Sequence, residues 1–455
     1  MPVRNDSAPA AEANVRLIVP LWASAVFFAV MNTTMFNVSL PAVIEGLGIT
    51  PGMGSWVLSG YSITFAMATL VASRLSDFVP LRTLLTAGVV LMGAASVAGL
   101  AADRFAWLTA IRVVQAMGAG TVSGIGVIMV RRLVPFERRG RALSMLAAGS
   151  ALSYGAGPIA GGFLTALFGW NAMFLVPCLI LPLGLYLRSQ VPKEKLPRQR
   201  FDATGAALTA AMSVLLLLAL TQRSAALFAF GAALAALNAA YLLRVRDPFV
   251  ALDVLRVPHY PKLVPLAMFA MGTNVSFLYL IPLMLDAVHG RGTAEIGLAL
   301  LPGALLSGFM SRYTGRWVDR YGPRRVMPAA MLVLMAAVTV LLLFLHRSAH
   351  AAMAAYLLFS PGFSALMSSM NHEISTLVPR EKLGSGAGLV QLLQFNGGAF
   401  GVALCGVLLD LNAQLPPGRM YAGPLALIAA FLVTAASFLL WYLLASRRRW
   451  AGDVR

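Results

Sequence analysis

The sequence is poor in charged residues and in the side chains that build most catalytic and metal sites. Charged residues make up 11% of the 455 residues and hydrophobic residues 59%, whereas a soluble globular domain carries about a quarter charged residues. Both cysteines lie within apolar runs, and the sequence contains no Gly-x-x-x-x-Gly-Lys phosphate loop. The five histidines lack the spacing of metal ligands: His259, His289, His346, His350 and His372. We therefore expect no enzyme, no resident metal or cofactor, and no ATP-driven pump.

Long apolar stretches are abundant, and fourteen of them are long enough to cross a bilayer, which takes roughly 20 helical residues. Backbone groups in hydrocarbon must be paired within the segment, so Leu-, Ala- and Val-rich runs of this length predict helices. The sequence therefore predicts an all-α polytopic membrane protein. The expected spans are 17–40, 55–75, 83–102, 106–130, 142–167, 171–187, 203–221, 224–243, 262–288, 294–314, 326–345, 350–371, 383–409 and 423–446.

Basic residues outnumber acidic ones and gather in alternate loops. Lys and Arg number 35 against 17 Asp and Glu. Arg112 lies within a span, and 29 of the 35 basic residues fall in one set of alternate loops and the two termini. The other set of loops contains Arg104, Arg223, Arg291, Arg347 and Arg419. This positive-inside pattern predicts cytoplasmic termini in a bacterial cytoplasmic membrane. We expect membrane lipids as partners and no nucleic acid.

Two charged signatures occur once in each half of the chain. Asp77 lies in a basic loop after the second span, and Asp319 lies in a similar loop 242 positions later. Glu137 and Glu381, after the fourth and twelfth spans, are 244 positions apart. Matched spacing indicates two pseudo-symmetric six-helix halves plus two inserted helices, with the substrate site between the halves. The expected units are an N-terminal half at 1–187, linkers with two inserted helices at 188–261, and a C-terminal half at 262–455.

Several segments together resemble the major facilitator superfamily, specifically its fourteen-helix drug:proton antiporter branch, and most of all the Gram-positive tetracycline exporters. The matching segments include the runs Asn32–Pro41, Arg112–Gly120 and Gly155–Gly162, together with the Asp77 and Asp319 loops. The resemblance covers essentially the whole chain. It implies a secondary transporter that works by alternating access, with protons as the coupling ion, and we expect a monomer.

The resemblance implies a conformational gate in the two repeated loops. Its expected residues are Asp77, Arg82, Gly315, Asp319, Gly322 and Arg324. The second loop follows the family pattern, whereas the first has Ser73 and Pro80 where the family prefers glycine. The alternative is that both loops are basic segments that set topology and end helices. Both interpretations are compatible with one another.

Arg112 and Glu373 are the expected proton-coupling residues. An Arg within a span costs a few kcal/mol unless it faces the bundle and finds partners, and Gln115 lies on the same helix face. The resemblance implicates Arg112 in coupling, and Glu373 is a titratable group near a span end. The alternatives are that Arg112 reaches outward to the headgroups and that Glu373 is a structural helix-end residue.

A small-residue run in the fifth span lets a neighbouring helix approach closely. Its residues are Gly155, Gly157, Pro158, Gly161 and Gly162. In the family this motif marks antiporters, so the resemblance implies export. An ordinary packing face is the alternative.

The expected substrate cavity is lined by uncharged polar residues: Asn32, Thr33, Asn37, Gln115, Tyr154, Asn274, Tyr279 and Asn371. The tetracycline exporters carry acidic residues where this chain has Thr33 and Tyr154, and related multidrug carriers carry Asp where it has Asn32. We therefore expect export of a neutral, zwitterionic or anionic compound, such as a secreted metabolite, a metallophore or a drug. Tetracycline or cationic multidrug efflux is one alternative, and proton-linked import is another.

Overall fold

The structure, a computed structural model, describes residues 8–450 apart from 136–137, 193, 195–201, 246–247, 251, 345–347 and 380–381. Glu137 and Glu381 lie outside the described residues. Helices dominate, and no strand occurs in the described ranges. The N-terminal half consists of α1 (Ala8–Leu47), α2 (Pro51–Leu75), α3 (Leu81–Gly99), α4 (Phe105–Leu133), α5 (Arg139–Phe168), η2 (Trp170–Phe174), α6 (Leu175–Cys178) and α7 (Ile180–Gln190).

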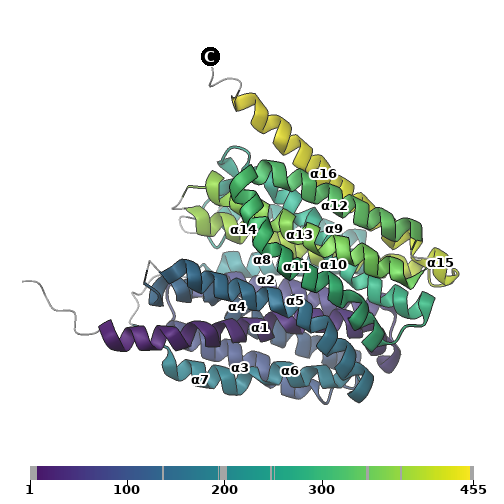
Figure 1. Cartoon of the computed structure of the whole chain (residues 1–455), viewed down its shortest axis with the longest axis horizontal. Helices are drawn as coiled ribbons and strands as arrows, with labels where there is room; N and C mark the ends of the chain where they lie inside the picture. The colour runs from purple at the N-terminus through teal and green to yellow at the C-terminus, as the bar shows by residue number, and fades with distance from the viewer. Residues whose placement is uncertain are drawn as a thin grey trace, which may run out of the picture.

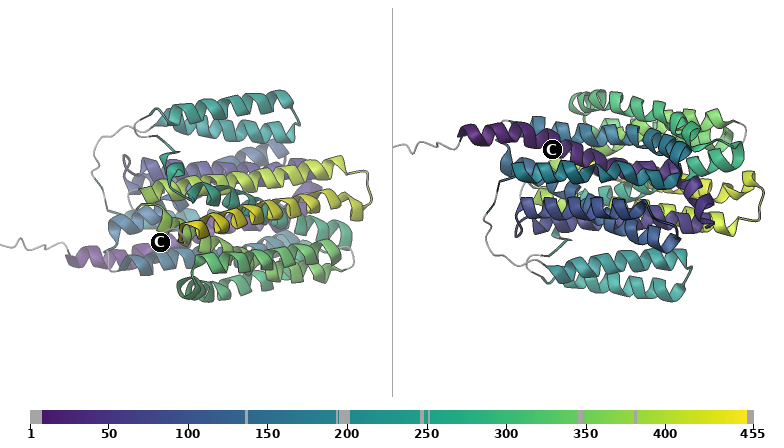
Figure 2. Two further views of the ribbon diagram at one scale, coloured as in Figure 1. Left: turned by 90° about the horizontal axis from the view of Figure 1, so that it is seen from above. Right: turned by 90° about the horizontal axis from the view of Figure 1, so that it is seen from below.

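The rest of the chain forms an inserted hairpin and a second half. The hairpin and its linker contain α8 (Ala203–Thr221), α9 (Ala225–Leu242) and η3 (Leu252–Arg256). The second half contains α10 (Tyr260–His289), α11 (Thr293–Tyr321), α12 (Pro323–Phe344), α13 (Ala349–Leu377), α14 (Leu383–Leu411), α15 (Pro417–Met420) and α16 (Ala422–Trp450). Figure 2 shows the α8–α9 hairpin beside the main bundle.

Thirteen described helical segments are long and apolar enough to cross a membrane. The thirty-residue α5 runs along α1 and α11, and its segment Leu152–Phe168 is also apolar. With α5, these segments correspond to the fourteen predicted spans, so the polytopic all-α fold is confirmed. The span predicted at 171–187 is interrupted at Leu179. Pro182 has no N–H to donate to the Cys178 carbonyl four residues earlier, which accounts for the interruption.

The two halves repeat the same packing order. In the first half α1 packs on α5, and α4 packs on both α2 and α3; in the second half α10 packs on α14, and α13 packs on both α11 and α12. α1 begins and α16 ends at the same end of the bundle, on the left of Figure 1. We call this the basic end, because it carries the Arg-rich loops, and the other the opposite end. The unit boundaries at 187/188 and 261/262 remain predictions.

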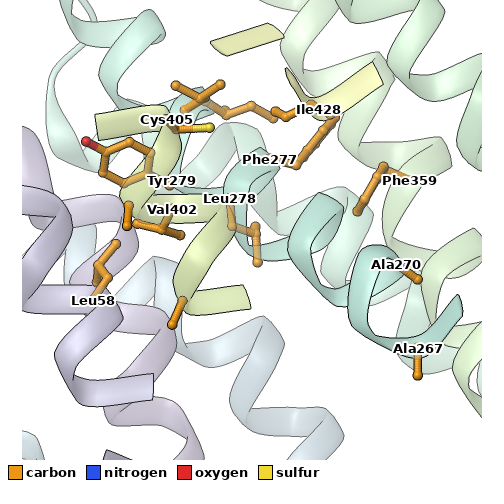
Figure 3. Packing of buried hydrophobic residues seen from close by; sticks show 14 of the residues in the cluster. Leu58, Ala267, Ala270, Phe277, Leu278, Tyr279, Phe359, Val402, Cys405 and Ile428 are labelled. Carbon is orange, nitrogen blue, oxygen red and sulfur yellow. The ribbon is translucent and has the colours of Figure 1, made fainter. Parts of the chain in front are cut away.

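Two helix pairs join the halves, α2 with α14 and α5 with α11. Between α2 and α14, Leu58 points toward Val402 (Figure 3), and the Ser59 hydroxyl donates to the Ala399 carbonyl over 3.0 Å. Within the second half, Phe277 stacks on Phe359 with ring centroids 4.1 Å apart. Apolar contacts and a few hydrogen bonds therefore hold the halves together.

The small-residue run of α5 contacts a different helix on each side. A Cβ atom at Gly157 would lie 1.8 Å from Thr34 Oγ1, and one at Gly161 would lie 2.6 Å from the Met35 carbonyl oxygen, both on α1. A Cβ atom at Gly162 would lie 2.5 Å from the Thr293 carbonyl oxygen of α11.

The α11 side of this run continues along the helix. A Cβ atom at Gly155 would lie 3.7 Å from Ala304 Cβ, and one at Gly297 would lie 2.6 Å from the Pro158 carbonyl oxygen. One glycine-rich surface thus packs α5 inside its own half and against the other half.

We expect Gly161→Ala to lower the stability of the protein by about 1–3 kcal/mol, because the new methyl group meets backbone that cannot rotate away. Thermal unfolding of the purified full chain in detergent measures the change. Gly308→Ala on α11 is the matched control, since nothing lies within 4 Å of its added Cβ atom. Equal melting temperatures for the two variants would contradict this account of the packing.

Candidate functional site

Arg112 of α4 is a buried cation at the centre of the N-terminal half. Its exposed fraction is 1%. One terminal nitrogen donates to Asn32 Oδ1 over 3.2 Å and to Gln115 Oε1 over 2.7 Å. The guanidinium carbon lies 3.8 Å from the ring centre of Phe36 and 3.9 Å from that of Tyr61. Two amides and two aromatic faces therefore surround the charge, and it does not reach the headgroups.

The partners of Arg112 are fixed by further hydrogen bonds. Gln115 donates from Nε2 to the Ser96 hydroxyl over 2.8 Å, and Asn32 donates from Nδ2 to the Tyr61 hydroxyl over 3.3 Å. Thr33 is half-buried. Since amide and hydroxyl groups stand where a carboxylate would neutralise the cation, the site keeps a positive charge.

Two nitrogens of the Arg112 guanidinium, Nε and the second terminal nitrogen, have no hydrogen-bond partner among the described residues. Burying such groups without partners costs free energy. The stacked rings of Phe36 and Tyr61 offset part of this cost, because a desolvated cation–π contact stabilises the charge by about 2 kcal/mol. Sequence reasoning expected Gln115 beside Arg112 and expected Asn32 in the substrate cavity, and the structure brings all three together. It missed Phe36 and Ser96, whose chemistry gives no sign of a role before the helices are packed.

The other expected cavity residues are spread over different environments. Asn37 and Asn274 are buried, with exposed fractions of 7% and 9%, and Asn371 is exposed. Tyr154 is 47% exposed. The structure does not bring these residues into one cluster with Arg112.

In the first gate loop, the carboxylate of Asp77 lies 3.2 Å from the guanidinium of Arg132 at the end of α4. Arg132 also lies 3.6 Å from Glu194, which accepts the Leu81 N–H over 3.0 Å. Arg82, the other charged residue expected in this gate loop, lines a neighbouring groove with Glu194. The Asp77 carboxylate therefore connects α2 to α4 within one half.

The second gate loop has a different set of contacts. Asp319 is exposed, and nothing lies within 4 Å of a Cβ atom added at Gly315. Gly322 ends α11 with φ of +77°, a conformation that side chains disfavour. Arg324 donates from Nε to Glu373 over 3.0 Å.

Glu373 is the buried carboxylate of the C-terminal half, with an exposed fraction of 3%. It accepts hydrogen bonds from Arg324 on α12 and from the Tyr442 hydroxyl on α16. Tyr442 was not expected from the sequence, because its position opposite α13 depends on the packing of α16. Arg112 and Glu373 are the two charged side chains that are buried in the described part of the chain.

A carboxylate at the opposite end joins the two halves. Asp410, near the end of α14, accepts the Gly52 N–H over 2.9 Å and the Thr50 hydroxyl over 3.1 Å at the start of α2. A Cβ atom at Gly52 would lie 1.9 Å from the Asp410 carboxylate. The N-terminus of a helix favours an anion, so Asp410 both caps α2 and completes a contact between the halves.

Other hydrogen bonds reinforce this closure. Tyr279, expected in the cavity, donates its hydroxyl to the Pro51 carbonyl over 2.7 Å, and Thr293 donates to the Gly162 carbonyl over 3.3 Å. Within the described ranges, side-chain hydrogen bonds between the halves lie in the middle or at the opposite end of the bundle. The molecule is therefore closed at the opposite end. A sequence signal existed for Asp410, because an acidic residue at a helix C-terminus opposes the helix dipole and needs a partner.

Metal binding finds no support in the described residues, which contain no group of three or more His, Cys, Asp or Glu side chains able to hold an ion. The buried charged groups are instead Arg112, a cation without an acidic partner, and Glu373, a carboxylate bound to Arg324. Such a site can bind and orient a molecule or exchange a proton. It has no activated nucleophile and no two neighbouring carboxylates that could cleave a bond.

We expect Asp410→Ala to open the opposite end of the bundle, because the α2 N-terminus loses its anionic cap and its contact with α14. A Ser55→Cys reporter, placed in a chain with Cys178→Ala and Cys405→Ala, lies buried between α2 and α14 in the closed state. Its labelling by a membrane-impermeant maleimide should rise several-fold.

Glu295→Ala is the matched control for this measurement. Glu295 is an acidic residue at the same end, and its carboxylate lies 3.2 Å from the guanidinium of Arg291, which is also exposed. This ion pair does not join the two halves. Glu295→Ala should leave the labelling rate unchanged. If Asp410→Ala also leaves the rate unchanged, Asp410 does not hold this end closed.

Comparison with known proteins gives the chain its family. The model of the Major Facilitator Superfamily matches residues 22–402. The chain is 30% identical over 409 residues to the methyl viologen resistance protein SmvA of Salmonella typhimurium, covering 85% of this chain and 82% of that protein. It is 27% identical over 417 residues to the uncharacterized transporter YebQ of Escherichia coli, covering 88% and 91%. It is also 28% identical over 426 residues to the putative multidrug resistance protein MdtD of Klebsiella pneumoniae, covering 88% of each.

Solved structures share the fold. A bacterial homolog of the lysosomal transporter Spinster, in an inward-facing conformation, superposes with a TM-score of 0.69 at 16% identity and covers 97% of this chain and 98% of that one. A D-xylose–proton symporter superposes with a TM-score of 0.68 at 14% identity, covering 95% and 96%. These proteins are transporters rather than enzymes. The chain belongs to the major facilitator superfamily and is a multi-pass transporter of the bacterial inner membrane.

Proposed function

We propose that this transporter is a proton-coupled exporter of a small neutral, zwitterionic or anionic compound. The observation that carries the proposal is the buried charge of Arg112, which is held by Asn32 and Gln115 and has no carboxylate partner. A desolvated cation without a counter-ion repels cationic substrates and attracts carboxylate, sulfonate or phosphate groups. A secreted metabolite, a metallophore or an acidic drug meets this requirement.

Glu373 is the group that binds and releases the coupling proton in this proposal, and Arg112 is the second proton-coupling residue, which keeps its positive charge. Coupling needs a titratable group shielded from bulk water, and Glu373 is the buried carboxylate of the described residues. Its partners Arg324 and Tyr442 come from two other helices. Loss or gain of a proton at Glu373 therefore changes the contacts among α12, α13 and α16.

The export direction is supported by the α5 glycine run and by the names of relatives. This run packs on α1 and α11 and helps to close the opposite end, which under the positive-inside prediction faces away from the cytoplasm. In the family that the sequence resembles, the same glycine run marks antiporters, which export their substrates. Relatives named for multidrug and methyl viologen resistance support the same direction.

A second candidate is efflux of cationic drugs, including tetracycline–metal chelates. It is favoured by the name of the Salmonella relative, since methyl viologen is an organic cation. The sequence argues against it, because this chain has the neutral residues Asn32, Thr33 and Tyr154 where the carriers of cationic drugs that it resembles have acidic ones. Proton-linked import is a further alternative, compatible with the same fold.

Deletion of the gene is expected to remove one compound from the spent medium and to raise it inside the cells. Untargeted mass spectrometry of medium and cell extracts from the deletion strain and its parent measures this. The compound should carry no net positive charge at neutral pH. A cationic compound would support the drug-efflux alternative instead, and uptake of the compound by the parent would support import.

We expect Glu373→Gln to abolish transport driven by a pH gradient in proteoliposomes while substrate exchange without a gradient continues. Tyr442→Phe removes one partner of the carboxylate and keeps the titratable group, so it should retain gradient-driven transport at a reduced rate. If Glu373→Gln retains full gradient-driven transport, Glu373 is a structural partner of Arg324 and proton coupling lies elsewhere.

A further inference from the structure

We propose that a groove between α1 and α5 at the basic end binds the phosphate headgroup of an anionic phospholipid. The inference is independent of the substrate and of the direction of transport. The groove encloses about 430 Å³. Its charged lining consists of Arg16 from α1, Arg138 from the residue before α5, and Arg141 from the first turn of α5.

The other described residues that line the groove are apolar, and no acidic residue is among them. They are Val15, Val19, Pro20, Val134, Ala142 and Met145. A groove lined by three arginines and by apolar side chains matches a ligand with an anionic head and a hydrocarbon tail. A phosphate accepts paired, planar hydrogen bonds from arginine guanidinium groups.

The groove opens toward lipid rather than toward the interface of the halves. Met145 shares one face of α5 with Leu152, Phe163 and Leu167, because their spacings of seven, eleven and four residues are close to whole helical turns. The exposed fractions of these four side chains are 36%, 66%, 40% and 70%. Phe163 and Leu167 lie at the closed opposite end, so their exposure there is to lipid.

The other two faces of α5 are already occupied. Gly155 and Gly162 face α11, and Gly157 and Gly161 face α1. The stripe that begins at Met145 is the remaining outward surface of this helix. An acyl chain can follow it from the groove into the hydrocarbon.

The arginines lie at the depth of the headgroups. Arg16 directly precedes the apolar stretch predicted at 17–40, and Arg141 lies in the first turn of α5. Arg139 donates to the Arg131 carbonyl over 2.7 Å and to the Val134 carbonyl over 3.0 Å, which pins the turn between α4 and α5. Basic pockets between helices at this depth bind anionic lipid headgroups.

A second basic groove between α3 and α7 is a weaker anion site. It encloses about 760 Å³ and contains Arg82 and Arg188, but Glu194 also lines it. The carboxylate of Glu194 repels a phosphate. The α1–α5 groove therefore has the clearer preference for an anion.

Native mass spectrometry of the full chain in detergent, titrated with phosphatidylglycerol or phosphatidylcholine, tests the site. We expect one tightly bound phosphatidylglycerol and no equivalent phosphatidylcholine. The double variant Arg16→Gln and Arg141→Gln should weaken that binding step by about 30-fold. This is the change in dissociation constant expected when two basic residues near a membrane surface lose their attraction to an anionic lipid.

The matched control is the double variant Arg244→Gln and Arg256→Gln, which removes two exposed arginines of the same basic end outside the groove. It should bind phosphatidylglycerol like the unmodified chain. An unchanged melting temperature without added lipid shows that each variant is folded.

Three results would overturn the proposal. Equal loss of binding in both double variants would indicate a diffuse charge effect, and unchanged binding in the groove variant would place the lipid elsewhere. Displacement of the lipid by millimolar inorganic phosphate or glycerol 3-phosphate would indicate a site for free phosphate compounds.

Discussion

Helices in a hydrocarbon solvent gain little from burying apolar side chains, so their association depends on close backbone approach and on a few polar contacts. In this chain α5 supplies that approach. Its glycines bring it against α1 on one side and against α11 on the other. The same helix therefore fixes the geometry of the N-terminal half and part of the contact between the halves. Closure at the opposite end, and the outward lipid-facing stripe of α5, both follow from this arrangement.

The charges of the protein are distributed according to what each can do in lipid. The sequence assigns 29 of the 35 basic residues to one set of alternate loops and the termini, where water and headgroups can solvate them. Arg112 stays inside and is stabilised by amides and aromatic faces, so it keeps its charge without a counter-ion. Asp410 is placed on the N-terminus of α2, which offers N–H groups and a favourable dipole. Each group links different helices, since Arg112 of α4 contacts α1 and α2 and Asp410 of α14 contacts the start of α2.

The candidate site could be predicted from the sequence only in part. Arg112 and Gln115 were expected to lie together, because an intramembrane Arg requires partners and Gln115 lies one turn away, whereas Asn32 was expected only as a residue of the substrate cavity. Asp77 and Arg82 were both expected in the first gate loop, and the structure pairs Asp77 with Arg132 of α4. Tyr279 was expected in the cavity and instead donates to the Pro51 carbonyl. These contacts depend on the relative height and rotation of helices, and hydropathy contains no information on either.

The sequence by itself determined that the protein lies in a lipid bilayer, how many spans it has, that its two halves are related, and the family to which it belongs. Each of these depends on composition and on periodicities along one chain, and hydrocarbon leaves helices as the available structure. The tertiary structure alone decided which polar groups meet. Asp410 and Thr50 are 360 positions apart, and Glu373 and Tyr442 are 69 positions apart. Such pairs form because packing of α2 on α14 and of α16 near α13 brings them within hydrogen-bond distance, and that packing is a property of the whole bundle.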